Sequence, residues 1–280
     1  MGPPMAHSPR SRIRAVQKER LAMKLLDLFC GAGGSAVGYQ QAGFEDITGV
    51  DIVSQRHYPF RFIQGDALGY LATHGAEYDA IHASPPCQGY SVMQNLPWLR
   101  HKEYPLLILP TMEMLEALGR PYVLENVMGA RYGAKGLTVR GLEAHGLKAG
   151  WLCGQMFGKP YYRHRLFATD WLWLAPEHPK HRDRIRAASA IAAPQPLRRQ
   201  GRGLATWQEY NKAQGKGCGV GHATGWRLAA EAMVIDWMKR ADLTQAIPPV
   251  YTEHIGKSLK RFLEAERERC QSLFDKAITY

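Results

Sequence analysis

The sequence predicts an α/β fold with a parallel, doubly wound sheet, and three observations support this prediction. Short apolar segments of strand length alternate with segments of helical spacing in the first half of the chain, as in parallel sheets covered on both faces. The first apolar segment runs directly into a glycine-rich turn, residues 30–35, and then into a helical pattern. Polar and reactive residues follow several apolar segments, at the strand ends where such sheets bind ligands.

Each element follows from its local pattern. Buried strands are expected at residues 24–29, 47–50, 61–64, 78–83 and 121–124. A first helix begins near Val37, after the glycine turn, and a second covers residues 104–118. The strand at residues 121–124 places Glu125 at its carboxyl end.

The chain changes character after Trp173. Residues 176–227 contain ten lysines or arginines against three acids, a net charge of +7, and their prolines and glycines favour loops around a small scaffold. Residues 226–238 return to helical spacing, and residues 258–274 form an amphipathic helix that is expected to pack on the core. Residues 1–22 carry five basic residues and one acid among prolines, which predicts a flexible basic arm.

Length, charge and cysteine content limit the possible functions. At 280 residues with 45% hydrophobic content, one core and one smaller inserted region are expected. The formal charge of +11 favours a polyanionic partner, nucleic acid above all. Five cysteines without a Cys-x-x-Cys pair argue against a disulfide framework and a structural zinc site. No segment resembles a membrane span or a signal peptide, so a cytoplasmic protein with no membrane partner is expected.

The glycine turn is a cofactor signal. Gly31, Gly33 and Gly34 allow the backbone to approach a ligand closely, and the following helix offers free amide groups. Asp51, after the second strand, is placed to accept hydrogen bonds from ribose hydroxyls. Asp66 is placed either to accept a hydrogen bond from an adenine amino group or to cap a helix. Because nicotinamide and flavin proteins have similar turns, these residues alone do not identify the cofactor.

A reactive set follows the later strands. Cys87 comes after two prolines at the end of a buried strand and before a polar turn, a setting that presents a thiol as a nucleophile. Glu125 lies at the same sheet edge, where its pKa can be raised so that it serves as an acid. Arg163 and Arg165 alternate on a further strand and are expected to share one face. That face is either plain surface or a pair of guanidinium groups aimed at a base carbonyl and a phosphate.

With these residues the chain resembles the cytosine-5 DNA methyltransferase family. The motifs that carry the resemblance run in order from about residue 24 to 260: Asp27 to Gly34, Pro86-Cys87-Gln88 with Ser91, Glu125-Asn126-Val127, Arg163-His164-Arg165 and Gly256-Lys257-Ser258. The resemblance implies a Rossmann-like methyltransferase sheet with a small basic target-recognition insertion, S-adenosylmethionine as cofactor and double-stranded DNA as partner. The implied divisions are the arm at 1–22, a catalytic and cofactor-binding domain at 23–173, target recognition at 174–232 and a C-terminal return at 233–280.

The resemblance also implies roles for individual residues. Cys87 adds to carbon 6 of a flipped-out cytosine, Glu125 hydrogen-bonds ring nitrogen 3, and carbon 5 then attacks the sulfonium methyl. Arg163 and Arg165 complete the catalytic set. The residues expected at the cofactor are Phe29, Gly31, Gly33, Gly34, Asp51, Ile52, Asp66, Pro86, Lys257 and Ser258. The expected setting is a monomer in a bacterial or phage-infected cell, with a nuclease partner neither implied nor excluded.

Lys257 departs from the family pattern, in which asparagine follows the glycine. A lysine near the transferred group would repel a sulfonium unless an anion lay between them. Carboxy-S-adenosylmethionine, which would give 5-carboxymethylcytosine, is therefore an alternative cofactor. Three further functions stay open from the sequence: an amino-methyltransferase, an RNA cytosine-5-methyltransferase and a catalytically silent DNA-binding protein.

Two further expectations concern single segments. Residues 89–102 are expected to form a mobile loop that closes over the flipped base. No metal is expected, because His178 and His181 have no carboxylate or cysteine beside them at ligand spacing.

Overall fold

The computed structural model describes residues 22–91, 103–131, 142, 145–159, 161, 163–179 and 226–278. The expected amino-terminal arm lies outside these residues except for Ala22, and so do residues 180–225 of the basic insertion. The expected mobile loop is described only at residues 89–91.

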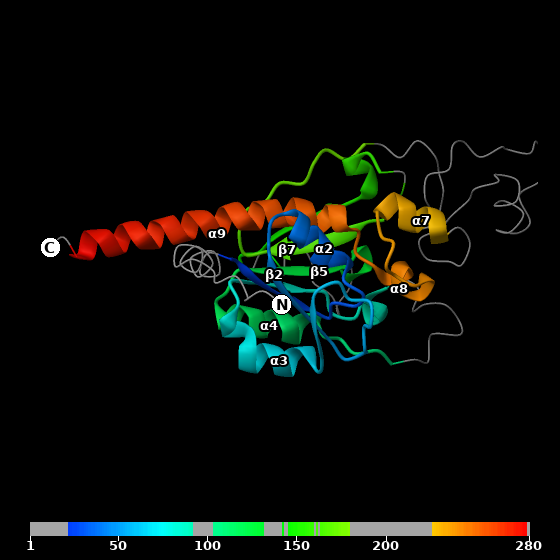
Figure 1. Cartoon of the computed structure of the whole chain (residues 1–280), viewed down its shortest axis with the longest axis horizontal. Coiled ribbons are helices and arrows are strands. Elements are labelled where there is room, and N and C mark those ends of the chain that lie inside the picture. Colours follow the sequence, from blue (N-terminus) through cyan, green and yellow to red (C-terminus); the bar gives the residue numbers. More distant parts are fainter. Residues whose placement is uncertain are drawn as a thin grey trace, which may run out of the picture.

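A seven-stranded sheet of order β3-β2-β1-β4-β5-β7-β6 forms the centre of the described fold (Figure 1). Its strands are β1 (Lys24–Leu28), β2 (Asp46–Asp51), β3 (Arg61–Gln64), β4 (Ala80–Ala83), β5 (Tyr122–Val127), β6 (Lys148–Leu152) and β7 (Arg165–Thr169). Strands β1 to β5 pair in parallel, as predicted, whereas β7 is antiparallel to both β5 and β6. The predicted α/β fold with a doubly wound sheet is thus confirmed, and β6 and β7 extend it by antiparallel pairing that the sequence did not indicate.

The order of the strands reverses at β1. The chain first builds outward from β1 to β2 and β3, and then returns to place β4 and β5 on the other side. The carboxyl ends of β1 and β4 meet because Leu28 pairs with Ala83. Such a reversal opens a crevice beyond the strand ends, which is where doubly wound sheets bind ligands.

Two apolar layers cover the sheet because side chains alternate along each strand. Leu25 packs in the layer that contains α2 (Gly34–Gln41) and the first half of α9 (Pro249–Ile278). Leu26 and Leu28 face the opposite layer, which contains α3 (Ala67–His74) and α4 (Ile108–Leu118). Figure 1 shows these helix pairs on the two sides of the sheet.

The C-terminal helices differ from the expected ones. The helix expected at residues 226–238 ends at Met233, because Val234 has a positive φ of 58°, and α8 (Arg240–Gln245) follows. Helix α9 begins at Pro249, whose fixed φ suits the first turn of a helix. Its early residues Leu259 and Leu263 are buried, as expected of a helix that packs on the core.

The far end of α9 does not follow this expectation. Leu273 and Phe274 are 61% and 62% exposed, and Figure 1 shows this end of the helix extending past the rest of the described fold. Within the described residues, no helix combines the length and the apolar character that a membrane crossing requires.

Candidate active site

The turn after β1 has a strained backbone. Phe29, Gly31 and Gly33 have φ angles of 56°, 48° and 85°. Glycine adopts such angles at little cost, whereas for a residue such as Phe29 they cost about 1–2 kcal/mol. Strain of this kind concentrates at ligand sites, so the turn is the first candidate for a binding function.

The glycines of this turn are required for different reasons. A side-chain carbon added at Gly31 would meet no atom within 4 Å, so the turn is open there. A carbon added at Gly33 would lie 2.7 Å from Pro59 Cδ, and one at Gly34 would collide with the Ile247 carbonyl oxygen. The turn is therefore tightly backed by protein on one side and open on another.

Asp51 is tied directly to this turn. Its Oδ2 accepts a hydrogen bond from the Gly31 N–H at 2.9 Å, and its Oδ1 accepts one from the Val53 N–H at 2.9 Å. Ile52 and Val53 follow it with side chains that are 72% and 60% exposed. A carboxylate beside an exposed apolar pair offers hydrogen bonds to a sugar and a surface to a flat base.

Asp66 lies next to Asp51, since the Gly65 N–H donates to the Asp51 carbonyl oxygen at 3.0 Å. Its side chain caps α3, because Oδ2 accepts a hydrogen bond from the Gly69 N–H at 2.7 Å. The capping role considered for Asp66 is thus observed. Its contact with an adenine amino group stays a prediction.

Asp27, which is fully buried near the end of β1, supports the glycine turn from the protein core. Its Oδ2 accepts hydrogen bonds from Ser35 Oγ at 2.8 Å and from the Tyr58 hydroxyl at 3.2 Å. Complete burial raises the pKa of this carboxyl group to about 8, against the opposing effect of these two hydrogen bonds. Asp27 therefore joins β1 to the first turn of α2 and fixes where the glycine turn begins.

A C-terminal segment that the sequence did not single out backs the glycine turn. Trp237 Nε1 donates to the Ala32 carbonyl oxygen at 2.8 Å. Ile247 touches Gly34, and Pro249 and Thr252 touch Gly38 one turn further along α2. The Pro248-Pro249 pair, typical of a helix start, is the sequence signal that marks this segment.

The way in which α9 packs along α2 corrects the expectation for Lys257 and Ser258. Gly256 packs on Ala42, at the far end of α2, about 12 Å from the glycine turn at a rise of about 1.5 Å per residue. Lys257 Nζ donates to Glu253 Oε1 at 2.6 Å, and Ser258 Oγ accepts a hydrogen bond from Trp171 Nε1 at 3.3 Å. Neither residue lies at the turn, so the basis for choosing carboxy-S-adenosylmethionine is removed.

Cys87 lies beyond the carboxyl end of β4, beside the glycine turn. Ser84, between the strand and the cysteine, donates from its backbone N–H to Leu28 at 3.2 Å and from Oγ to Phe29 at 3.3 Å. Pro85 is buried, while Pro86 and Cys87 are half-buried. Burial raises the pKa of the Cys87 thiol, and Arg165 and Arg163 act in the opposite direction.

Asn126 holds the loop that carries Cys87. Its Nδ2 donates to the Pro85 carbonyl oxygen at 2.9 Å, and its Oδ1 accepts from the Val127 N–H at 2.9 Å. On the other flank, the Tyr90 hydroxyl accepts a hydrogen bond from the Ile108 N–H at the start of α4, at 3.1 Å. The thiol is therefore presented from a loop fixed at both ends. The sequence indicated Asn126 only as part of a motif.

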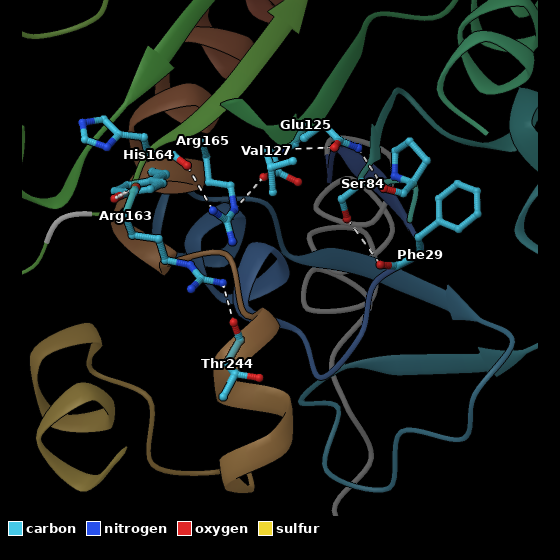
Figure 2. Close-up of polar contacts among 11 residues, drawn as sticks. Phe29, Ser84, Glu125, Val127, Arg163, His164, Arg165 and Thr244 are labelled. Carbon is cyan, nitrogen blue, oxygen red and sulfur yellow. Dashed lines mark hydrogen bonds and ion pairs between the residues drawn. The ribbon is translucent and has the colours of Figure 1, made fainter. Parts of the chain in front are cut away.

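Glu125 forms a buried ion pair with Arg165. Arg165 Nε lies 3.1 Å from Glu125 Oε1, and the two side chains are 14% and 7% exposed. The N–H is not aligned for a hydrogen bond to this oxygen, so the contact is mainly electrostatic. Burial raises the pKa of Glu125 to about 7 although both arginines lower it. Figure 2 shows the Arg165 guanidinium turned toward Glu125 and Val127.

Arg163 has a different partner, contrary to the expectation that both arginines share one face of a strand. It precedes β7, which begins at Arg165, and its Nη2 donates to the Thr244 carbonyl oxygen at 2.8 Å (Figure 2). The Tyr251 hydroxyl donates to the Arg163 carbonyl oxygen at 2.5 Å. Burial lowers the pKa of Arg163 to about 9. Arg163 thus joins β7 to the C-terminal segment behind the glycine turn.

The structure brings most of the expected residues into two adjoining groups. Arg163 and Arg165 lie close enough to Cys87 and Glu125 to act against the rise in the pKa of both groups. Glu125 lies inside β5 and not after it, so it is more buried than expected. Elsewhere, Cys153 and His164 lie beside His178, although no thiol stands at ligand spacing from that histidine in the sequence.

Comparison with known proteins agrees with this geometry. Residues 23–169, slightly more than half of the chain, match the family described as C-5 cytosine-specific DNA methylase. Type II methyltransferase M.NlaX of Neisseria lactamica is 26% identical over 228 residues, which cover 71% of this chain and 70% of that protein. Type II methyltransferase M.AgeI of Thalassovita gelatinovora is 26% identical over 187 residues, 57% of this chain and 42% of its own length.

Other relatives match shorter parts. Type II methyltransferase M.XorII of Xanthomonas oryzae is 30% identical over 123 residues, 39% of this chain and 29% of its own, so the chain spans less than half the length of some curated relatives. Among solved structures, the methyltransferase EhMeth of Entamoeba histolytica is 14% identical with a TM-score of 0.41, covering 56% of this chain and 57% of that one. From the family match over residues 23–169, the chain belongs to the C-5 cytosine-specific DNA methylase family.

Proposed function

We propose that the protein is a DNA (cytosine-5)-methyltransferase that acts through a covalent Cys87 adduct. The observation that carries the proposal is the half-buried Cys87, presented beyond β4 next to the buried Glu125–Arg165 ion pair. A nucleophile, a group able to hold a proton near neutral pH and a fixed cation lie together. This combination suits attack on a neutral heterocycle whose ring acquires charge during the reaction.

The residues around the glycine turn fit S-adenosylmethionine. The open space at Gly31, the exposed Ile52 and the carboxylate of Asp51 together make a niche with polar and apolar parts. Phe29 follows β1 and Pro86 follows β4, and the two segments are joined where Ser84 Oγ donates to the Phe29 carbonyl oxygen at 3.3 Å. In this proposal Asp51 and the turn amides hold the sugar and the amino-acid part, and the cofactor supplies an electrophilic methyl group when bound.

The chain's own groups would act in sequence on a cytosine outside the duplex. Cys87 reacts as a thiolate and forms a bond from Sγ to carbon 6 of the ring. Glu125 hydrogen-bonds ring nitrogen 3 and so stabilises the electron density that the attack displaces onto the ring. Carbon 5 is thereby made nucleophilic and would take the methyl group from the sulfonium of S-adenosylmethionine, which leaves as the neutral thioether S-adenosylhomocysteine. Loss of the proton on carbon 5 to water restores the double bond and breaks the bond from Sγ to carbon 6, which releases Cys87 as the thiolate.

The arginines would position these groups. Arg165 keeps the Glu125 carboxyl group oriented through the 3.1 Å ion pair. Arg163 is anchored to Thr244, so the catalytic crevice and the C-terminal segment behind the cofactor niche are built as one unit. Asn126 restrains the Pro85 carbonyl and with it the loop that carries the nucleophile. Asn126 is therefore proposed as a positioning residue.

Double-stranded DNA is the proposed partner. The formal charge of +11 favours a phosphate backbone, and the net +7 of residues 176–227 makes the region 174–232 the proposed site of target recognition. The catalytic and cofactor-binding part is proposed to comprise residues 23–173, completed by residues 233–280.

Covalent trapping tests the function directly. Incubation with S-adenosylmethionine and a library of duplexes carrying 5-fluorocytosine should give a denaturant-stable complex, because fluorine cannot leave as a proton does. Cys87→Ser should give none, while Cys270→Ser, an exposed cysteine, should trap like the wild type. Parallel assays of tritium transfer to DNA and to RNA separate the two substrates. A Cys87→Ser variant that transfers methyl groups normally would overturn the mechanism.

A further inference from the structure

Three metal-binding side chains come together beside the two arginines of the proposed catalytic group. Cys153 follows β6, His164 immediately precedes β7, and His178 lies beyond β7. Their ligand atoms all lie within 4.8 Å of one another. Such a grouping is invisible in the sequence, because the three residues are well separated along the chain and belong to different segments.

The donor set suits a specific class of ion. One thiol and two imidazoles are the borderline-soft ligands that zinc and similar divalent transition metals prefer, whereas magnesium and calcium take oxygen ligands. We propose that Cys153, His164 and His178 form a binding site for one zinc-class transition-metal ion. The proposal is independent of the methyltransferase function.

The geometry is close to that of a bound ion. Zinc bonds sulfur at about 2.3 Å and imidazole nitrogen at about 2.0–2.1 Å, so tetrahedral donors lie roughly 3.3–3.6 Å apart. The observed 4.8 Å limit means that the side chains close by about an ångström when the ion enters. Rotation about side-chain bonds provides such a shift without moving the strands.

A coordinated metal removes the proton from a thiol, so the buried Cys153 can serve as a thiolate ligand once an ion is bound. The ring centroids of His164 and His178 lie 5.4 Å apart, which brings both imidazoles within reach of one ion.

Aromatic contacts hold the two imidazoles in place and shield them. The Trp151 ring centroid lies 5.1 Å from that of His164 and 4.6 Å from that of His178. A hollow of about 340 Å³ is lined by Trp151, Met156 and His178, so an ion can approach the group of ligands from the side of His178. A metal site needs such an entry path as well as its donors.

The position of the site gives it a structural consequence. His164 lies between Arg163 and Arg165, and His178 lies just before the basic residues 180–227. A bound ion would therefore tie residue 178, at the start of the basic segment, to the amino-terminal end of β7, where His164 lies between the two arginines. Its loss is expected to loosen this end of β7 while leaving the glycine turn, on the other side of β4, intact.

Metal analysis of the purified full-length chain tests the proposal. After removal of any affinity tag, dialysis against zinc should leave about one equivalent per chain, and cobalt should give a thiolate-to-metal charge-transfer band. Cys153→Ser should lose that band, and His178→Gln should weaken binding by more than about 100-fold, since even groups outside the ligand shell contribute about 10–100-fold. Matched controls are Cys270→Ser and His57→Gln, whose side chains are exposed.

The outcomes separate binding from folding. Circular dichroism of each variant without metal shows whether it folds, and His178→Gln serves if Cys153→Ser does not. Added zinc should raise the unfolding temperature of the wild type and of the controls but not that of His178→Gln. The proposal is overturned if the wild type retains less than a tenth of an equivalent, or if the Cys153→Ser, His178→Gln double variant binds zinc as the wild type does.

Discussion

Glu125 is buried, and its environment therefore differs strongly from that of a solvated carboxylate. Burial raises its pKa to about 7, and Arg165 prevents a larger shift. At neutral pH the group is therefore divided between its acid and its carboxylate forms. A carboxyl group in this condition can donate a hydrogen bond to a ring nitrogen, which a fully ionised one cannot.

This predicts a break in the pH profile that Glu125→Gln removes. Methyl transfer by the wild type should rise with pH while Glu125 keeps its proton, since Cys87 reacts as a thiolate and its pKa is raised, and should level off above about pH 7 as the proton on Glu125 is lost. Glu125→Gln should be slower by about 10²-fold or more and should lack the break near pH 7, since an amide does not titrate. Tritium transfer measured from pH 5.5 to 9 gives both profiles, and the same break in the variant would exclude Glu125 as its origin.

Asn126→Ala is expected to destabilise the protein locally. The substitution leaves the Pro85 carbonyl and the Val127 N–H without the partner that each now has, at a cost of about 1–3 kcal/mol in the free energy of unfolding. Covalent trapping should slow because the Cys87 loop loses a restraint. Urea denaturation checks the first effect. Gln271→Ala, which removes an exposed hydrogen bond to Asp275, is the control and should change stability by less than about 0.5 kcal/mol.

At the scale of elements, substitutions of two glycines are expected to have different effects: one in the glycine turn should weaken cofactor binding, and one at the start of α2 should lower stability. Gly31→Ala places a methyl group in open space, at a backbone φ of 48°, so it should weaken cofactor binding and cost only about 1 kcal/mol of stability. Gly34→Ala drives a methyl group into the Ile247 carbonyl, and relieving that overlap should cost about 1–3 kcal/mol.

Calorimetric titration with S-adenosylhomocysteine and urea denaturation of the two variants make the comparison. Gly31→Ala should lose more free energy of cofactor binding than free energy of unfolding. Gly34→Ala should lose more free energy of unfolding than Gly31→Ala does. Unchanged affinity in Gly31→Ala would mean that the open side of the turn is not the cofactor niche.

The sequence predicts the local elements well and the long-range contacts poorly. Strands β1, β2, β4 and β5 can be predicted because each is a short, largely buried run between polar turns, whereas β3, at the sheet edge, is only partly buried. Strand β6 carries no clear sequence signal, because four of its five residues are at least partly exposed. The contact of Ile247 with Gly34 joins residues more than two hundred positions apart, so periodicity carries no signal for it. Lys257 was misplaced for the same reason: a short motif fixes a residue type but not which turn of a helix faces a ligand.

At the scale of the whole molecule, buried ionisable groups make stability depend on pH. The folded-state pKa of Asp27 is raised from 3.8 to about 8 and that of Glu125 from 4.5 to about 7. Stabilisation from these groups is complete below about pH 4 and is lost as the pH rises through their folded values. His82 acts oppositely, because burial lowers its pKa from 6.5 to about 3, so its contribution is lost as the pH falls below 6.5.

Asp27→Asn should therefore gain stability relative to the wild type as the pH rises from 5 to 8. The gain is at most about 1.4 kcal/mol per pH unit, because the wild type must bury an ionised carboxylate or keep its proton. Urea denaturation across this range measures the difference. Glu264→Gln, at an exposed position of α9, should show no such trend, and a flat difference for Asp27→Asn would contradict the raised pKa.

The far half of α9 is expected to be dispensable for folding. Truncation after Arg269 keeps the buried Leu263 and the ion pair of Arg267 with Asp79 at 3.0 Å, and removes the exposed Leu273 and Phe274. The free energy of unfolding and cofactor affinity should stay within about 0.5 kcal/mol of the wild type. A larger loss would show that these side chains pack on residues outside the described part of the chain.

Because Trp237 and Ile247 support the glycine turn and Pro249 packs on α2, the niche can form only after most of the chain has been synthesised. A ribosome adding about 5–20 residues per second needs roughly ten to forty seconds to pass from α2 to the start of α9. During that interval the face of α2 that later meets α9 is uncovered, and the whole basic segment emerges before the niche can close. Nascent chains arrested before Trp237 should accordingly fail to retain S-adenosylmethionine, whereas chains released after α9 should bind it at once.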